Sequence, residues 1–106
     1  MYSVETSVKV VRPEGALTAA NADAFKEEML SAITSGSTNE VAIDMAAVDS
    51  VDNSGLVALL AGFDTAKRHS KRISVRDVAP SVRIVFELAQ LDRAVSIVDQ
   101  PNLQAA

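Results

Sequence analysis

Hydrophobic residues recur along the chain with two spacings, which predict strands and helices in alternation. Runs rich in β-branched residues at 7–11, 40–48, 72–78 and 94–98 are typical of strands, and 16–18 should continue the first one after a break at Pro13 and Gly15. Spacings of three and four predict helices from Asn21 to about Gly36, from Ser54 to Arg68 and from Pro80 to Ala89. This order predicts a single α/β domain: a four- to five-stranded, mostly parallel or mixed sheet packed with three main helices.

The same spacings predict which side chains face the core. In the strand at 40–48, Val41 and Ile43 fall on one side and Ala42 and Asp44 on the other. The helix positions expected to be buried are Ala22, Phe25, Met29, Ala32 and Ile33 in the first helix, Leu56, Leu59, Leu60 and Phe63 in the second, and Val82, Val85, Phe86 and Ala89 in the third. Three phenylalanines therefore belong to one core.

The segment VDNSGL, at 51–56, joins the end of an apolar run to the start of the second helix. Asp52 or Asn53 would cap that helix, and Gly55 would let the chain turn sharply off the strand. The segment also lies beyond the carboxyl end of a strand, where ligands of open α/β sheets gather. A hydroxyl there, on Ser54, would sit where a helix N-terminus favours anions, so it could accept a phosphoryl group without unfolding the chain.

The length and composition of the chain limit the classes of function that it can have. A chain of 106 residues forms one domain, for which 99–106 is expected to be a frayed tail, and a net charge of −4 argues against nucleic-acid binding. The basic run at 67–72 is interpreted as a helix end and a solvated turn. The sequence has no cysteine and no apolar run long enough to span a membrane, and its first residues lack the basic start and apolar core of a secretory signal. A cytoplasmic protein is therefore expected.

The sequence gives little support for a catalytic site or a cofactor-binding site. The sole histidine, His69, follows about fifteen residues after Ser54, or roughly 22 Å along a helix, which is too far for a base that activates the hydroxyl. Neither a calcium-binding loop nor a glycine-rich phosphate loop occurs. We therefore expect no catalytic residue, metal or cofactor. Turnover abolished by Ser54→Ala would revive the alternative of a small enzyme.

Residues 43–97 resemble the core of the sulfate-transporter and anti-sigma-antagonist (STAS) domain, and VKVVRPEGALTAANADAFKEEM resembles its opening strand and first helix. The most specific piece is D-x-S-G-L followed by a Leu/Ala helix, and LDRAVSI near the end adds to it. The chain departs from the family at Asn53, where a second hydroxyl residue is frequent, and at Thr18, where many members have Asp.

The resemblance implies an anti-sigma factor antagonist of bacterial type. Such a protein binds an anti-sigma factor that is also a serine kinase, is phosphorylated at the position of Ser54, and is reset by a phosphatase. The partner-binding residues implied around the acceptor are Thr18, Asn21, Asp52, Asn53, Gly55, Leu56 and Val57, with Gly55 keeping the approach open. The alternative is a STAS accessory subunit of a transporter or signalling assembly without a phosphorylation switch. An exposed edge strand would also allow homodimers.

Overall fold

The computed structural model describes residues 8–36, 38–91 and 96–98, and side chains in all of these except 96–98. Along the chain the elements are β1 Val8–Val11, β2 Gly15–Leu17, α1 Ala22–Thr34, β3 Glu40–Asp44, β4 Val48–Val51, α2 Asn53–Arg68, β5 Arg72–Arg76, α3 Pro80–Leu88 and β6 Ser96–Val98. The expected tail at 99–106 and the first residues of the strand expected at 94–98 lie outside the described residues.

Four strands form the main sheet in the order β1-β3-β5-β6, and every neighbouring pair is parallel. Two short strands, β2 and β4, form a second parallel pair. Between successive strands of the main sheet the chain passes through a helix, as the alternation of periods requires. The predicted α/β class with a largely parallel sheet is confirmed.

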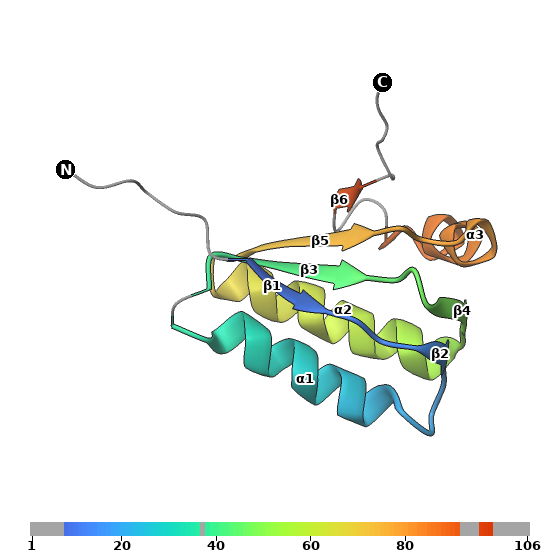
Figure 1. Ribbon diagram of the computed structural model, residues 1–106, viewed down its shortest axis with the longest axis horizontal. Helices are drawn as coiled ribbons and strands as arrows, with labels where there is room; N and C mark the ends of the chain where they lie inside the picture. The colour runs from blue at the N-terminus through green and yellow to red at the C-terminus, as the bar shows by residue number, and fades with distance from the viewer. Residues whose placement is uncertain (1–7, 37, 92–95, 99–106) are drawn as a thin grey trace.

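The helices α1 and α2 lie side by side on one face of the main sheet (Figure 1). Both begin at the end of the molecule to which the strands point, and β2, β4 and α3 lie at that same end. The core between the helices and the sheet is apolar, and Phe25, Phe63 and Phe86 all belong to it, as predicted. This arrangement places the N-termini of two helices together beyond the carboxyl ends of the strands.

The strand expected at 40–48 is wrong in its extent, because the chain turns after Asp44. The Asp44 carboxylate accepts a hydrogen bond from the Ala46 amide at 3.0 Å, and the Val48 amide donates to the Met45 carbonyl at 3.0 Å. The residues from Val48 onward then pair with β2 instead of continuing β3. An apolar sequence concealed this turn, since Met45 and Val48 are buried on both sides of it.

Four positions expected in the core are not fully buried. Leu60 is 46% exposed and Ala89 is exposed, while Leu56 and Val85 are partly exposed. Ala42, expected opposite Val41 and Ile43, is itself fully buried. Spacing identifies which residues share a helix side, but what packs against that side depends on the tertiary arrangement.

The basic run at 67–72 is part of the scaffold. The Lys71 ammonium donates hydrogen bonds to the backbone carbonyls of Ser35 and Thr38, which joins the end of α2 to the turn after α1. Arg68 forms an exposed ion pair with Asp64 one helical turn earlier, at 3.1 Å. The end of α2 at Arg68 agrees with the expected helix end, whereas Lys71 in the turn after it is bound to backbone carbonyls rather than solvated.

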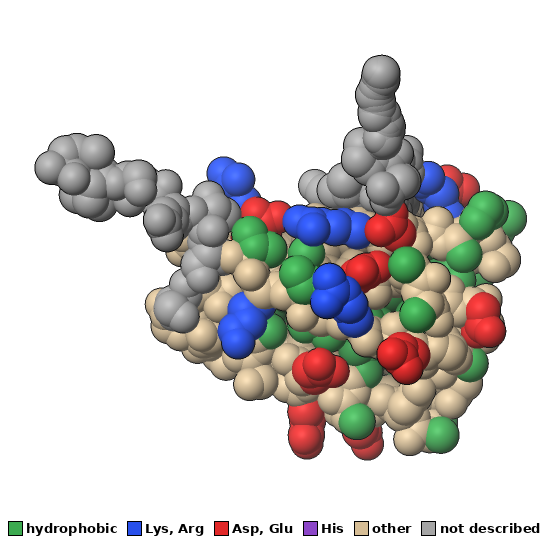
Figure 2. Space-filling view, viewed as in Figure 1, with side chains coloured by type: hydrophobic (Ala, Val, Ile, Leu, Met, Phe, Trp, Pro, Cys, Tyr) green, Lys and Arg blue, Asp and Glu red, His purple; other side chains and the backbone are tan. Residues whose placement is uncertain are grey.

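On the face shown in Figure 2, basic, acidic and hydrophobic side chains are interspersed, and a hydrophobic group lies at the α3 end.

Candidate functional site

The segment 51–56 is the junction between β4 and α2, and Asp52 caps the helix. Its side-chain oxygen Oδ1 accepts a hydrogen bond from the Gly55 amide at 3.1 Å, while its own amide donates to the Leu17 carbonyl at 2.9 Å. The helix therefore begins at Asn53, as expected to within a residue. A carboxylate at this position satisfies one of the free amides of the first turn.

Ser54 lies in that first turn, two residues after the cap. Its side chain is partly exposed, and no described residue is hydrogen-bonded to its hydroxyl. The hydroxyl thus keeps its donor and both lone pairs for water or a partner. Since the first-turn amides and the helix dipole favour negative charge, an anionic group attached here would be tolerated by the fold.

Ser54 borders a hollow of about 350 Å³ between the N-terminal halves of α1 and α2. The residues that line this groove are Ala19, Ala22, Asp23, Lys26, Asn53, Ser54, Val57 and Ala58. Its walls are mostly small side chains, with Val57 57% exposed on the α2 side. A groove of this kind between two helices can receive a protruding side chain or a helix end of another protein. We call it the α1–α2 groove.

Thr18 and Asn21 shape the loop that leads into α1. The Asn21 side chain accepts from the Thr18 amide and donates to the Ala16 carbonyl, both at 2.9 Å, and the Thr18 hydroxyl accepts from the Ala20 amide at 3.2 Å. Neither side chain lines the α1–α2 groove. Their hydrogen bonds instead fix the backbone from which Ala19 reaches the groove.

Gly55 has a different role from the one its sequence context suggests. It lies within α2 and is buried, so it neither turns the chain off the strand nor keeps the approach to Ser54 open. A Cβ placed on it would lie 2.8 Å from the Leu17 carbonyl oxygen and 2.9 Å from the Val51 side chain. Glycine is therefore required by the close approach of α2 to β2 and β4. Leu56 likewise packs against the core rather than toward the groove.

Asp23 and Lys26, on the α1 side of the groove, were missed by sequence reasoning. Both fall on the polar side of α1 and are exposed, which in the sequence looks like an ordinary solvated helix face. The sequence gives one signal for them: they are three residues apart, and such residues are neighbours on a helix surface. Only the packing of α1 along α2 shows that they face Ser54 across the groove.

The structure also bears on three features that the sequence argued against: a histidine base near Ser54, a metal site and a membrane-spanning helix. His69 follows the last turn of α2, whereas Ser54 is in its first, so the two lie at opposite ends of the helix. Among the residues that the structure describes, no cluster of three potential metal ligands occurs. Within those same residues, no helix has the length and apolar character needed to cross a bilayer.

Comparison with protein families gives a match over almost the whole chain. The family model described as "Mlab, STAS domain" matches residues 1–99. This range contains the groove and all the elements that form it.

Solved structures of several other proteins share this fold. A Thermotoga maritima protein named as a candidate anti-sigma factor antagonist is 21% identical, with a TM-score of 0.81 over 96% of this chain and 86% of that one. The phosphorylated form of the Bacillus cell fate determinant SpoIIAA is 19% identical, with a TM-score of 0.71 over 95% and 89% of the two chains. The STAS domain of a SulP transporter from Vibrio cholerae is 15% identical, with a TM-score of 0.72 over 92% and 78%. At these identities the likeness establishes the fold.

Proposed function

The chain belongs to the STAS domain family, and from that premise we propose that it is an anti-sigma factor antagonist controlled by phosphorylation of Ser54. In its unphosphorylated form it binds an anti-sigma factor that has serine kinase activity, and the α1–α2 groove is the surface that receives this partner. Phosphorylation of Ser54 by the partner ends the complex, and a phosphatase restores it. The chain itself acts as a binding module, with no catalytic residue, metal or cofactor of its own.

One observation carries this proposal: the Ser54 hydroxyl is free of hydrogen bonds to described residues and lies on the border of the groove. A phosphate there adds about −1.5 to −2 charges at neutral pH, directly in the surface that a partner must cover. Loss of about 2.8 kcal/mol of binding free energy, through an unpaired or repelled phosphate, weakens binding about a hundredfold. The fold remains intact because the N-terminus of α2 accommodates the charge.

The charges around Ser54 support a switch that acts on binding. Asp52 precedes the acceptor by two residues and Asp23 lies across the groove, while Lys26 is the cation on the same border. A new phosphate is therefore repelled by two carboxylates and attracted by one ammonium group. The N-terminus of α2 tolerates this charge but does not cancel it, so a partner that presents its own acidic or apolar surface is rejected.

The test uses a purified anti-sigma factor kinase, ATP and Mg²⁺. We expect the intact mass of the wild-type chain to rise by one phosphate, and the mass of Ser54→Ala to stay unchanged. Binding measured by calorimetry should be retained by Ser54→Ala and lost by Ser54→Asp. The matched control is Ser50→Asp, because Ser50 is an exposed serine on β4 outside the groove. Equal binding by all variants would contradict the switch.

A second candidate function is an accessory subunit of a transporter, in which the same groove docks permanently on another subunit. The shared fold of the STAS domain of the SulP transporter from Vibrio cholerae supports it. This function needs no modification of Ser54. Its signature is stable capture of a transporter subunit, equal for wild type and Ser54→Ala, without phosphate incorporation in the presence of ATP and kinases.

A further inference from the structure

The strand β1 forms one edge of the main sheet. It pairs with β3 on one side, and among the described strands none pairs with its other side. Val8 and Val10 lie two residues apart on this strand, so both point to the sheet face away from the helices, and each is 39% exposed. An edge that no described strand covers and that carries exposed valines is a site where another strand can be added.

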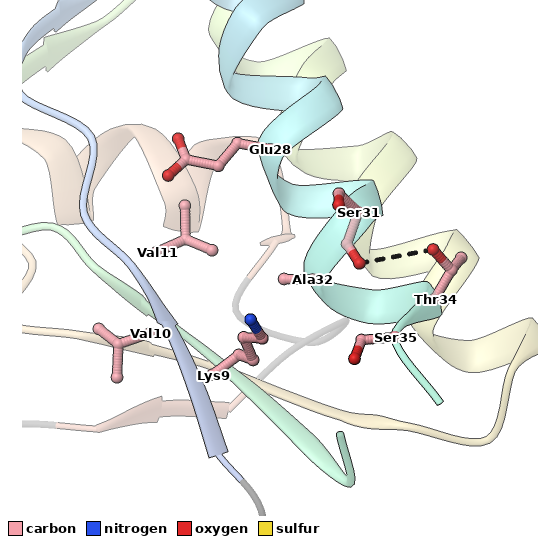
Figure 3. A pocket seen from close by; sticks show the side chains of 8 residues that line it. All are labelled: Lys9, Val10, Val11, Glu28, Ser31, Ala32, Thr34 and Ser35. Atoms are coloured by element: carbon pink, nitrogen blue, oxygen red, sulfur yellow. Dashed lines mark hydrogen bonds between the residues drawn. The ribbon is translucent and has the colours of Figure 1, made fainter. Parts of the chain in front are cut away.

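A hollow of about 470 Å³ runs along the other face of this edge, between β1 and α1. Its lining residues are Lys9, Val10, Val11, Glu28, Ser31, Ala32, Thr34 and Ser35. Figure 3 shows Lys9 pointing from β1 toward α1, near Ala32 and Ser35, whereas Glu28 lies beside Val11, further along the strand. Neither Lys9 nor Glu28 forms an ion pair within the described part of the chain.

We propose that this edge is a homodimer interface, in which β1 pairs antiparallel with β1 of a second copy. A two-fold axis perpendicular to the sheet makes such a pairing isologous and keeps the helices of both copies on one side. Because side chains alternate between faces, the axis must pass beside a residue that faces its own counterpart. The choice of that residue fixes the register.

Charge selects the register centred on Val10. With Val10 facing Val10 of the second copy, Lys9 faces Val11, whose neighbour on the helix side is Glu28. Facing residues have Cβ atoms about 4.5–5.5 Å apart, so the lysine side chain of each copy reaches the Glu28 carboxylate of the other. The register centred on Lys9 would instead place two ammonium groups face to face, which is unfavourable.

The register centred on Val10 also buries apolar surface. The two Val10 side chains meet on the open face of the sheet, and the two hollows are each filled by a lysine stem from the other copy. The main sheet then continues through both molecules, and the edge at β1 is removed. The interface lies on the flank of α1 that faces β1, whereas the α1–α2 groove lies on the other flank. A dimer therefore leaves both Ser54 residues accessible, and its existence does not depend on the proposed function.

The test is sedimentation of the full chain over a range of concentrations, with a charge-exchange cycle at the two residues. We expect Lys9→Glu and Glu28→Lys each to raise the dimer dissociation constant about tenfold or more, because two attractions become two repulsions in the symmetric interface. The double variant Lys9→Glu/Glu28→Lys restores the attraction with the signs exchanged, and should return the constant to within about threefold of wild type. Far-ultraviolet circular dichroism confirms that each variant is folded.

Val10→Lys places two ammonium groups on the two-fold axis and should abolish the dimer. The control Leu88→Lys changes an apolar residue that is 81% exposed on α3, away from the interface, and should leave the dimer unaffected. A wild-type chain that stays monomeric up to about 1 mM overturns the proposal. So does a dimer that withstands Val10→Lys, or a double variant that is no better than the single reversals.

Discussion

The close approach at Gly55 makes a quantitative prediction for Gly55→Ala. The added methyl group would lie 2.8 Å from the Leu17 carbonyl oxygen and 2.9 Å from the Leu17 and Val51 side chains. These distances are shorter than carbon contacts allow, and the oxygen belongs to a backbone that is hydrogen-bonded to Asp52. The helix must therefore move away from β2, which breaks packing at the site where α2 begins.

Two opposing terms determine the size of the effect. Overpacking of a well-packed core costs about 1–3 kcal/mol, and the upper part of this range applies where the backbone must shift. Alanine in a helix is favoured over glycine by about 1 kcal/mol. The expected net loss is about 2 kcal/mol of unfolding free energy. For a domain of this size, this lowers the melting temperature by about 8 °C.

Gly62→Ala is the matched control, because Gly62 is a buried glycine in the same helix and gains the same propensity. A Cβ on Gly62 would meet the thioether end of Met29, a flexible side chain that can change rotamer, rather than backbone. Urea unfolding followed by circular dichroism should therefore rank the stabilities as wild type, then Gly62→Ala, then Gly55→Ala. A Gly55→Ala chain as stable as wild type, or more stable than Gly62→Ala, would refute the reasoning.

Two further predictions concern the ends of α2. Asp52→Ala removes the cap of α2 and should cost about 1 kcal/mol in urea unfolding, whereas Asp52→Asn, which can still accept from the Gly55 amide, should cost less than half of that. Lys71→Met removes the donor to two carbonyl groups and should cost about 1–3 kcal/mol, while Lys67→Met on the exposed side of the same helix end should change stability by less than about 0.5 kcal/mol. Equal losses for Lys71→Met and Lys67→Met would show that the contacts of Lys71 contribute nothing.

The helices and the order of the elements could be predicted from the sequence because local patterns encode them. The period of α1, the cap at Asp52 and the proline that opens α3 each act within a few residues, and all three are observed. The turn after Asp44 could not be predicted, because the pairing of β4 with β2 is made by residues distant in the sequence. Apolar residues at the turn are buried by that pairing, so they resemble a continuous strand.

The site could be predicted only where it depends on local sequence signals. The position of Ser54 at a helix N-terminus follows from local signals, and the structure agrees. The groove itself depends on how α1 packs along α2, which places Lys26 and Asp23 opposite Ser54. The role of Gly55 was misjudged because a glycine after a strand suggests a turn. The need for glycine here comes instead from the close approach of Leu17, which lies 38 residues before Gly55 in the sequence.

The hydrogen bond from the Asp52 amide to the Leu17 carbonyl ties the loop before α1 to the loop before α2. The two rims of the groove are thereby held at a fixed separation before any other protein arrives. A binding partner then loses little free energy to the ordering of this surface, and recognition depends on matching a shape that already exists. Natural variation at the rims can change which partner is chosen without disturbing the frame that holds them.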